Sequence, residues 1–259
     1  AIMNNVLTSN QCDILTSKLE TLEERIKVEK ETDIAYFLSE RNLQFYNVHY
    51  QEPEHFLKYI DNLHIINVMQ KVLKDKIILS NFNASKSLKT EKNILRIHID
   101  SRKPNKDFSN TYQMVAMICL DDFNSKNGST VVVPRSHLTG KDPRGIEHSI
   151  KDVLTLSASK GSIIFIPGQT WHDVGQNISG ERRWAIIAYY SCWWIKPTYD
   201  FVNSCNSSIF KMLNNTQKEL LGFNSRPPIN WKRRQKTISD IANLPNNYKE
   251  ALNWDGNAS

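Results

Sequence analysis

A histidine and an aspartate stand two residues apart in the stretch Arg96-Ile97-His98-Ile99-Asp100, where apolar and polar residues alternate. On a β-strand this spacing places the side chains of His98 and Asp100 on the same face. An imidazole nitrogen and a carboxylate oxygen held there are two of the three ligands of the 2-His-1-carboxylate triad that binds non-haem Fe(II). Such tripeptides also arise by chance, so the pair indicates an iron site only if a second histidine completes it.

His172 is the candidate for the third ligand. It follows a strand-like run and the turn Pro167-Gly168-Gln169, and it begins another short apolar run. Further along, Arg183 opens the apolar segment that continues from Trp184. An arginine pointing into an apolar interior is costly unless it pairs with an acid, best of all through two hydrogen bonds. A dicarboxylate co-substrate that chelates the iron would supply that acid.

Helical spacing of apolar residues in the first part of the chain indicates the elements that flank these residues. We expect an amphipathic helix with Ser9 as its N-cap, and a second helix from Pro53 to about Lys74. The aromatic-rich segment 35–50 suggests a strand or a loop that contributes to a pocket wall. A further helix is expected near the end of the chain, closed by Gly222.

Beyond Lys76, helical spacing gives way to short β-rich runs separated by polar turns. These runs predict a mostly β fold with flanking helices, whose core at about residues 76–192 is a double-stranded β-helix, or jelly roll. The helical part 8–75 would pack on one sheet and the extension 193–259 would follow, all within a single domain 1–259. The eight predicted strands are 77–80, 94–100, 112–120, 130–133, 153–156, 162–166, 171–174 and 184–190.

The length of 259 residues fits one large domain or two small ones, and a hydrophobic content of 40% is enough for a globular core. No internal repeat or obvious linker divides the chain, so we expect one domain. Four widely spaced cysteines without a Cys-x-x-Cys pair argue against a zinc knuckle or a disulfide framework. No apolar run approaches the length of a membrane span, and residues 1–10 lack the order of a signal peptide. We therefore expect a cytoplasmic protein without a membrane span.

The balance of 33 Lys and Arg against 27 Asp and Glu gives a net charge of +6 and a pI of about 9.0. The densest basic run, 231–236, could contact the phosphates of a nucleic acid, although such runs are more often solvated surface. A positive balance also suits anionic small substrates.

Several motifs together resemble one family. The set His98-x-Asp100, Trp171-His172, Arg183 and the run Asn127-Gly128-Ser129-Thr130-Val131-Val132-Val133-Pro134-Arg135-Ser136-His137 is similar to the phytanoyl-CoA dioxygenase family of Fe(II)/2-oxoglutarate oxygenases. The resemblance covers roughly residues 76–192, and the segment 218–223 resembles a C-terminal element of the family. It implies His98, Asp100 and His172 as iron ligands and Arg183 as the partner of the distal carboxylate of 2-oxoglutarate. Arg182 should face the opposite side of the strand.

The resemblance also implies a reaction. Three protein ligands leave three iron positions, two for 2-oxoglutarate and one for O2. Decarboxylation of 2-oxoglutarate to succinate and CO2 would drive hydroxylation of a small molecule of lipid, amino-acid or natural-product type. Asp100 favours hydroxylation because halogenating relatives usually carry a small residue at this position, which leaves room for a halide.

The chain departs from the family pattern at three positions. Arg135 stands where members often have glycine, which hints at an acidic or phosphorylated substrate, and Met117 replaces a frequent tryptophan in the strand that faces the iron. Val174 stands where a small hydroxyl residue commonly helps to hold the co-substrate. The candidates for that second co-substrate contact are Ser80, Asn81, Asn83, Gln113 and Val174 itself.

Two alternatives remain beside the small-molecule hydroxylase. One is a 2-oxoglutarate oxygenase that acts on nucleic acid, with the basic run 231–236 as its handle. The other is a non-catalytic jelly-roll binding module with a vestigial metal site. His137, which closes the Pro-Arg-Ser-His turn, is expected to make a structural hydrogen bond rather than to bind metal.

Overall fold

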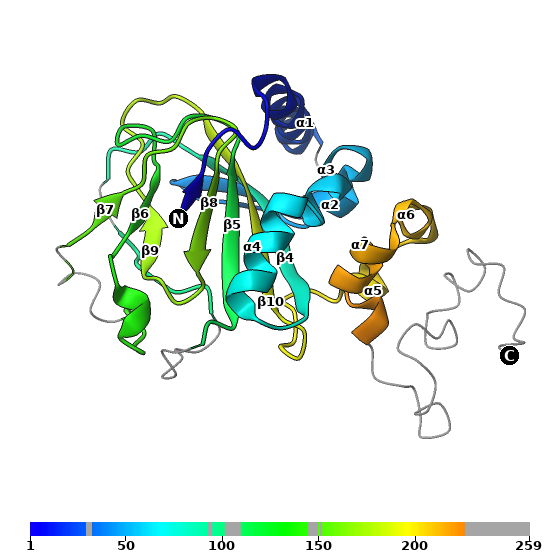
Figure 1. Ribbon diagram of the computed structural model, residues 1–259. Coiled ribbons are helices and arrows are strands. Elements are labelled where there is room, and N and C mark those ends of the chain that lie inside the picture. Colours follow the sequence, from blue (N-terminus) through cyan, green and yellow to red (C-terminus); the bar gives the residue numbers. More distant parts are fainter. Residues whose placement is uncertain (30–32, 93–94, 102–109, 145–149, 151, 226–259) are drawn as a thin grey trace, which may run out of the picture.

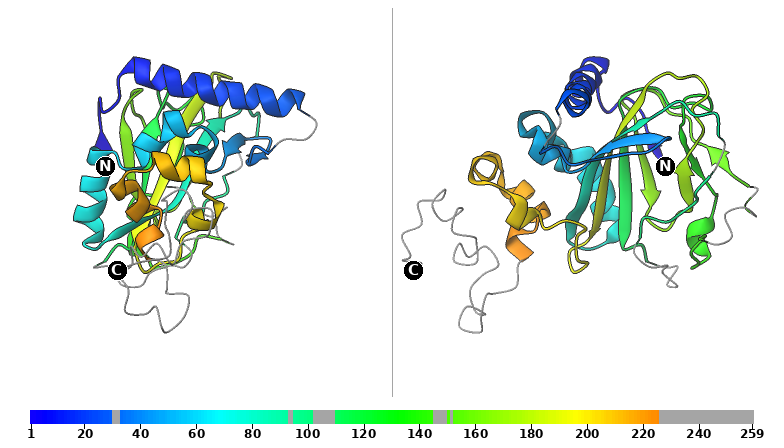
Figure 2. Two further views of the ribbon diagram at one scale, coloured as in Figure 1. Left: turned by 90° about the vertical axis from the view of Figure 1, so that its right-hand side faces the viewer. Right: turned by 180° about the vertical axis from the view of Figure 1, so that it is seen from behind.

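Two antiparallel sheets face each other in the computed structural model, which describes residues 1–29, 33–92, 95–101, 110–144, 150 and 152–225 (Figure 1). The larger sheet has the strand order β1-β8-β5-β10-β4-β3-β2 and the smaller sheet the order β7-β6-β9. Helices gather on the outer side of the larger sheet, away from the smaller one (Figure 2). This arrangement confirms the prediction of a mostly β, jelly-roll fold with flanking helices.

Most strands fall where alternating apolar residues predict them. Seven of the eight predicted runs form strands, whereas β1, β2 and β3 come from the first part of the chain. The segment 35–50 thus supplies two strands, one of the options that the sequence leaves open. The strands are β1 (Ile2–Met3), β2 (Tyr36–Leu38), β3 (Asn42–Phe45), β4 (Ile77–Ser87), β5 (Gln113–Cys119), β6 (Thr130–Val132), β7 (Leu154–Thr155), β8 (Ile163–Pro167), β9 (His172–Val174) and β10 (Arg183–Cys192).

The predicted strand 94–100 is wrong as a regular strand. Among its described residues, pairing consists of a single antiparallel bridge in which His98 and His172 exchange backbone hydrogen bonds of 3.0 Å. The backbone N–H groups of Asp100 and Ser101 then both donate to the carbonyl of Gly168, at 2.9 Å each. The turn at Gly168 therefore satisfies donors that a neighbouring strand would otherwise satisfy, and the ladder stops after one bridge.

The helices also correct two boundaries. The first helix, α1 (Ser9–Val28), is capped by Thr8, which forms a capping box with Gln11, so the expected N-cap Ser9 is the first helical residue instead. The expected helix 53–74 is divided into α3 (Pro53–Ile60) and α4 (Leu63–Leu73), because the side chain of Asn62 caps a new helix by accepting from the N–H groups of His64 and Ile65.

The end of the described chain is likewise divided. In place of one helix before Gly222 there are α6 (Ser207–Met212) and α7 (Asn215–Leu220), the latter with its own capping box. Gly222 follows with a φ of +87°, the left-handed conformation expected after a helix. The remaining helices are α2 (Val48–Gln51), α5 (Phe201–Ser204) and the 3-10 turns η1 (Ser136–Leu138) and η3 (Phe223–Ser225). In the described part of the chain, no helix combines the length and apolar character needed to cross a membrane.

Alternation along β10 separates two apolar layers. Trp184, Ile186 and Tyr190 belong to the large cluster between the main sheet and the helices, while Ala185 belongs to the smaller cluster between the two sheets. Since side chains alternate along a strand, Arg183 points with Ala185 toward the space between the sheets. The sequence of β10 thus directs one arginine into the interior of the jelly roll.

A buried histidine, His49 of α2, packs against the cluster under the helices. Its ring is fully buried and lies 5.3 Å from the ring of Phe82 and 5.1 Å from that of Phe201, measured between centroids. Neither ring nitrogen has a hydrogen-bond partner among the described residues. Burial lowers the pKa of His49 to about 3, because the charged ring would lose its hydration.

We expect acid to destabilise the protein through His49. Its pKa is lower in the folded than in the unfolded state, so stability is complete above the unfolded value near 6.5 and decreases as the pH falls toward 3. At pH 5 the loss amounts to about 2 kcal/mol. Urea unfolding at pH 7 and pH 5 should show this loss in the wild type and not in His49→Phe. A His64→Gln control, at an exposed histidine of α4, should behave as the wild type does; equal pH dependence in all three proteins would contradict the assignment.

Candidate metal centre

The three predicted ligands come together. One ligand atom from each of His98, Asp100 and His172 lies within 4.8 Å of the other two, the one such group among the described residues. The Nε2 atom of His172 is 3.2 Å from Oδ2 of Asp100, and the Nε2 atom of His98 is 4.0 Å from Oδ1. The bridge between His98 and His172 holds their rings 4.5 Å apart between centroids. The set therefore offers two nitrogens and one oxygen around a common point.

Backbone carbonyls fix the orientation of both histidine rings. The Nδ1 atom of His98 donates to the carbonyl of Arg96 at 3.0 Å, and that of His172 donates to the carbonyl of Thr170 at 2.8 Å. Because a carbonyl oxygen only accepts, each Nδ1 carries a proton and each Nε2 is directed toward Asp100. This is the arrangement in which Nε2 serves as a metal ligand.

The charges of the centre are mutually supporting. Burial alone would raise the pKa of Asp100, but the positive charge and hydrogen bond of His172 outweigh it and lower that pKa below its ordinary value. In turn, the carboxylate of Asp100 overcomes the burial of His172 and raises the pKa of its imidazole to about 9. A carboxylate and an imidazole that share a proton this closely are suited to share a divalent cation in its place.

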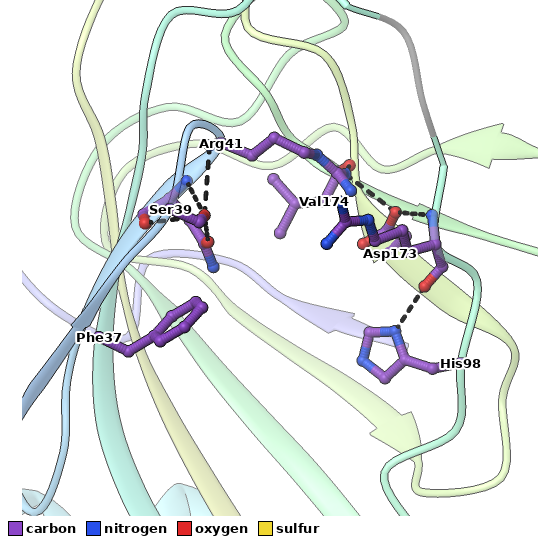
Figure 3. Close-up of a pocket in the computed structure, with 8 residues that line it drawn as sticks. Phe37, Ser39, Arg41, His98, Asp173 and Val174 are labelled. Carbon is purple, nitrogen blue, oxygen red and sulfur yellow. Dashed lines mark hydrogen bonds and ion pairs between the residues drawn. The ribbon is translucent and has the colours of Figure 1, made fainter.

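A second buried carboxylate, Asp173, fastens the elements around the centre. It accepts a hydrogen bond from the backbone N–H of Arg96 and one of 2.9 Å from Nη2 of Arg41, which also donates to the carbonyl of Val174 (Figure 3). One side chain thereby ties the β2–β3 hairpin and the segment before His98 to β9. Sequence reasoning missed this role; the available signal was an acidic residue directly after His172 in the predicted strand 171–174.

Beneath the triad lies a cavity of about 110 Å³, hereafter the inner cavity. Polar and apolar side chains from both sheets enclose it, so that small molecules reaching the triad would meet few waters. Its lining residues are Asn42, Gln44, Ser85, His98, Asp100, Val115, Met117, Thr130, Ile166, His172, Asp173, Val174, Arg183, Ile187 and Tyr189.

Arg183 lies in this cavity as a buried cation. Its side chain is 1% exposed, its guanidinium lies 4.7 Å from the ring centroid of Phe123, and it donates to the carbonyl of Gly128. Its Nε has no partner and no described carboxylate pairs with it, and burial lowers its pKa to about 10. Arg182 faces the other side of the strand, where it pairs with Glu20 at 2.7 Å. The buried guanidinium is thus suited to an incoming carboxylate.

Of the other residues singled out from the sequence, some line the inner cavity and some do not. Val174 and Met117 line the inner cavity, whereas Ser80 instead hydrogen-bonds Thr198 at 3.1 Å, and Asn81, Asn83 and Gln113 are not among the lining residues. Sequence reasoning missed polar lining residues of β3, β4, β6 and β10, although alternating polar positions in β3 and β4 were a usable signal. These missed residues are Asn42, Gln44, Ser85, Thr130 and Tyr189.

Arg135 does not approach the inner cavity. Its φ of +62° is left-handed, a conformation that glycine adopts without strain, which accounts for the frequent glycine noted at this position in the resembling family. Together with His137 it lines a different cavity of about 190 Å³. His137 lies outside the metal-ligating group. The basic run 231–236 lies outside the described residues.

Comparison with known proteins identifies the same family that the motifs resemble. A family model described as phytanoyl-CoA dioxygenase (PhyH) matches residues 1–185. The protein "Dioxygenase af480" of Aspergillus fumigatus is 26% identical over 170 residues, which cover 61% of this chain and 52% of that protein. The matches to curated relatives span from 40% to 52% of those proteins' lengths.

Solved structures share the fold at low sequence identity. HygX from Streptomyces hygroscopicus, solved with nickel and 2-oxoglutarate bound, has a TM-score of 0.59 and 13% identity, over 76% of this chain and 83% of HygX. The non-heme alpha ketoglutarate dependent epimerase SnoN from nogalamycin biosynthesis has a TM-score of 0.57 and 17% identity, over 76% of this chain and 80% of SnoN. At these identities the likeness concerns the fold.

We expect His172→Ala to weaken metal binding by at least about 100-fold, because loss of a ligand should exceed the 10–100-fold effect of losing a ligand's supporting partner. Titration calorimetry of the protein with Ni(II), an air-stable substitute for Fe(II), measures the change. The matched control His137→Ala removes a histidine outside the group and should keep the wild-type affinity. Equal affinities for His172→Ala and the wild type would refute the assigned ligand set.

Proposed function

The chain belongs to the phytanoyl-CoA dioxygenase family, whose enzymes depend on Fe(II) and 2-oxoglutarate, and from this premise we propose that it hydroxylates an unactivated C–H bond of a small molecule. One observation carries the proposal: the triad of His98, Asp100 and His172 borders the cavity in which Arg183 lies buried without a carboxylate partner among the described residues. The proposed metal site and the proposed binding site for a carboxylate at Arg183 thus share one cavity.

The residues of the centre fit Fe(II). Two imidazole nitrogens and one carboxylate oxygen are the donor set of non-haem iron oxygenases, and three protein ligands leave positions for other molecules. His98, Asp100 and His172 would hold the ion, with both rings oriented by backbone carbonyls. Bound there, Fe(II) supplies the redox chemistry by which O2 converts 2-oxoglutarate to succinate and CO2 and delivers its second oxygen atom to the substrate.

The inner cavity fits 2-oxoglutarate. Arg183 offers an unpaired Nε in a desolvated environment, where a carboxylate would neutralise its charge and hold the molecule in one orientation. Asn42, Gln44 and Ser85 add hydrogen-bonding groups on the side of β3 and β4. Apolar side chains such as Val115 exclude water from the remaining wall, which strengthens these polar contacts. The protein would therefore orient 2-oxoglutarate and exclude water from the site.

Asp100 bears on the outcome of the reaction. A carboxylate at this position occupies the place that a halide needs, which favours hydroxylation over halogenation. Hydroxylation adds one oxygen atom to the substrate, whereas epimerisation, the activity named for SnoN, leaves its mass unchanged. Mass spectrometry of the product distinguishes the two outcomes.

We expect the wild type to form succinate from 2-oxoglutarate with Fe(II), ascorbate and O2, and a member of a small-molecule panel to gain one oxygen atom. Asp100→Ala and His172→Ala should abolish this turnover, because each removes a ligand of the metal. Succinate is measured by coupled assay and the substrate by mass spectrometry. Unchanged turnover of 2-oxoglutarate in either variant would overturn the proposal. So would a wild type that forms no succinate, the result that the non-catalytic alternative predicts.

Neighbouring arginines provide a matched test of the co-substrate site. Arg183→Gln should raise the KM for 2-oxoglutarate by at least about 30-fold, since truncating one member of a buried charge pair costs roughly 2 kcal/mol or more. Arg182→Gln removes the same charge from the opposite face and should leave the KM within about twofold. Thermal unfolding of both variants separates lost binding from lost structure. The role of Arg183 is refuted if folded Arg183→Gln retains the wild-type KM.

A further inference from the structure

A second cavity, of about 250 Å³, lies beside the triad and is called here the outer basin. It shares Asn42, His98, Asp173 and Val174 with the inner cavity, so the two cavities adjoin at His98. Figure 3 shows the basin between the β2–β3 hairpin and the segment that carries His98. Its complete lining is Phe37, Ser39, Arg41, Asn42, Arg96, His98, Asp173 and Val174.

Two arginines give the basin an excess of positive charge. Arg41 is engaged by Asp173 and by the carbonyl of Val174. Arg96 is exposed, and among the described residues no carboxylate forms an ion pair with its side chain. Glu40 is close enough for Arg96 to help lower its pKa, but that shift is due mainly to Lys92, whose Nζ lies 2.8 Å from the Glu40 carboxylate. The lining therefore holds two guanidinium groups and one carboxylate.

The hairpin contributes one large apolar side chain, Phe37, to the lining of the basin. The ring of Phe37 lies on the hairpin side of the basin in Figure 3, and the side chain is 49% exposed. Its neighbours Tyr36 and Leu38 are 41% and 58% exposed, so the whole of β2 presents large apolar side chains to solvent. Since side chains alternate along a strand, Phe37 is the residue of β2 that lines the basin, whereas Tyr36 and Leu38 point to the other face.

We propose that the outer basin binds the substrate, and that this substrate is an amphipathic organic acid whose carboxylate pairs with Arg96 while its apolar part packs on Phe37. The inference rests on the proposed function and narrows its substrate class. A molecule held between these two groups lies against His98, which places its carbon atoms beside the metal centre. Arg41, already fixed by Asp173, positions the hairpin and adds to the positive potential.

Arg183 and Arg96 differ in solvent exposure, and each exposure suits a different ligand. Arg183 is 1% exposed and accepts only a carboxylate that sheds its water, as 2-oxoglutarate would in the inner cavity. Arg96 is solvent-exposed at the rim and tolerates a partner that remains partly hydrated. Arg135, the cation that the sequence suggested for an anionic substrate, lines another cavity. In this proposal Arg96, and not Arg135, pairs with the anionic group of the substrate.

Matched probes test the basin on the full chain loaded with Ni(II) and 2-oxoglutarate, which binds without turnover. We expect 4-phenylbutyrate to bind about 5-fold more tightly than 4-phenylbutyramide, its neutral counterpart, with a difference that shrinks as NaCl is added. Titration calorimetry measures both affinities. Arg96→Gln should abolish the preference for the acid, Arg96→Lys should retain most of it, and Arg135→Gln should leave it intact.

Each contrary result is informative. Equal binding of acid and amide by the wild type, failure of both probes to bind, or an unchanged preference in Arg96→Gln overturns the basin assignment. Loss of the preference in Arg135→Gln overturns it in favour of the other cavity. A fall in affinity for 2-oxoglutarate in Arg96→Gln as large as that in Arg183→Gln would make the basin a co-substrate site instead. Succinate formation by the wild type tests the proposed function separately, because it requires no carboxylate preference.

Discussion

The arrangement of the metal centre depends on the buried carboxylate of Asp173. A buried carboxylate is costly unless hydrogen-bond donors surround it, and here the donors come from two distant parts of the chain, Arg41 and the backbone of Arg96. Satisfying one charge therefore brings the β2–β3 hairpin and the segment with His98 against β9, which carries His172. The same interaction positions the candidate metal ligands and forms part of the wall of the outer basin.

The strand β10 shows how one element supports both core and chemistry. Every second residue, such as Trp184 and Ile186, packs under the helices and anchors the strand in the largest apolar cluster. Of the intervening residues, Arg183, Ile187 and Tyr189 line the inner cavity. The desolvation cost of Arg183 is tolerated because the packed face holds the strand in place. A charge in this position contributes little to stability, and the proposed binding of a carboxylate would account for it.

Residue types and spacing were sufficient to predict the jelly roll and the convergence of His98, Asp100 and His172, because alternation and ligand chemistry are local properties of a sequence. Contacts between distant segments were beyond such reasoning. The ladder at 94–100 ends because the carbonyl of Gly168, far along the chain, accepts its hydrogen bonds. Arg41 was unremarkable until the fold placed it beside Asp173. The left-handed backbone of Arg135 likewise becomes visible only in three dimensions.

Under the proposed function, the ion-pair energies expected at Arg183 and Arg96 divide selectivity between co-substrate and substrate. A guanidinium as buried as Arg183 rejects partners that leave it unpaired, so it can select one dicarboxylate strongly. An exposed guanidinium such as Arg96 adds at most about 1 kcal/mol, enough to favour acids but too little to choose among them. Discrimination between acids must then come from the shape of the basin and from Phe37. Because β2 lies at the edge of its sheet, substitutions in β2 would alter the shape of the proposed basin with little effect on the core.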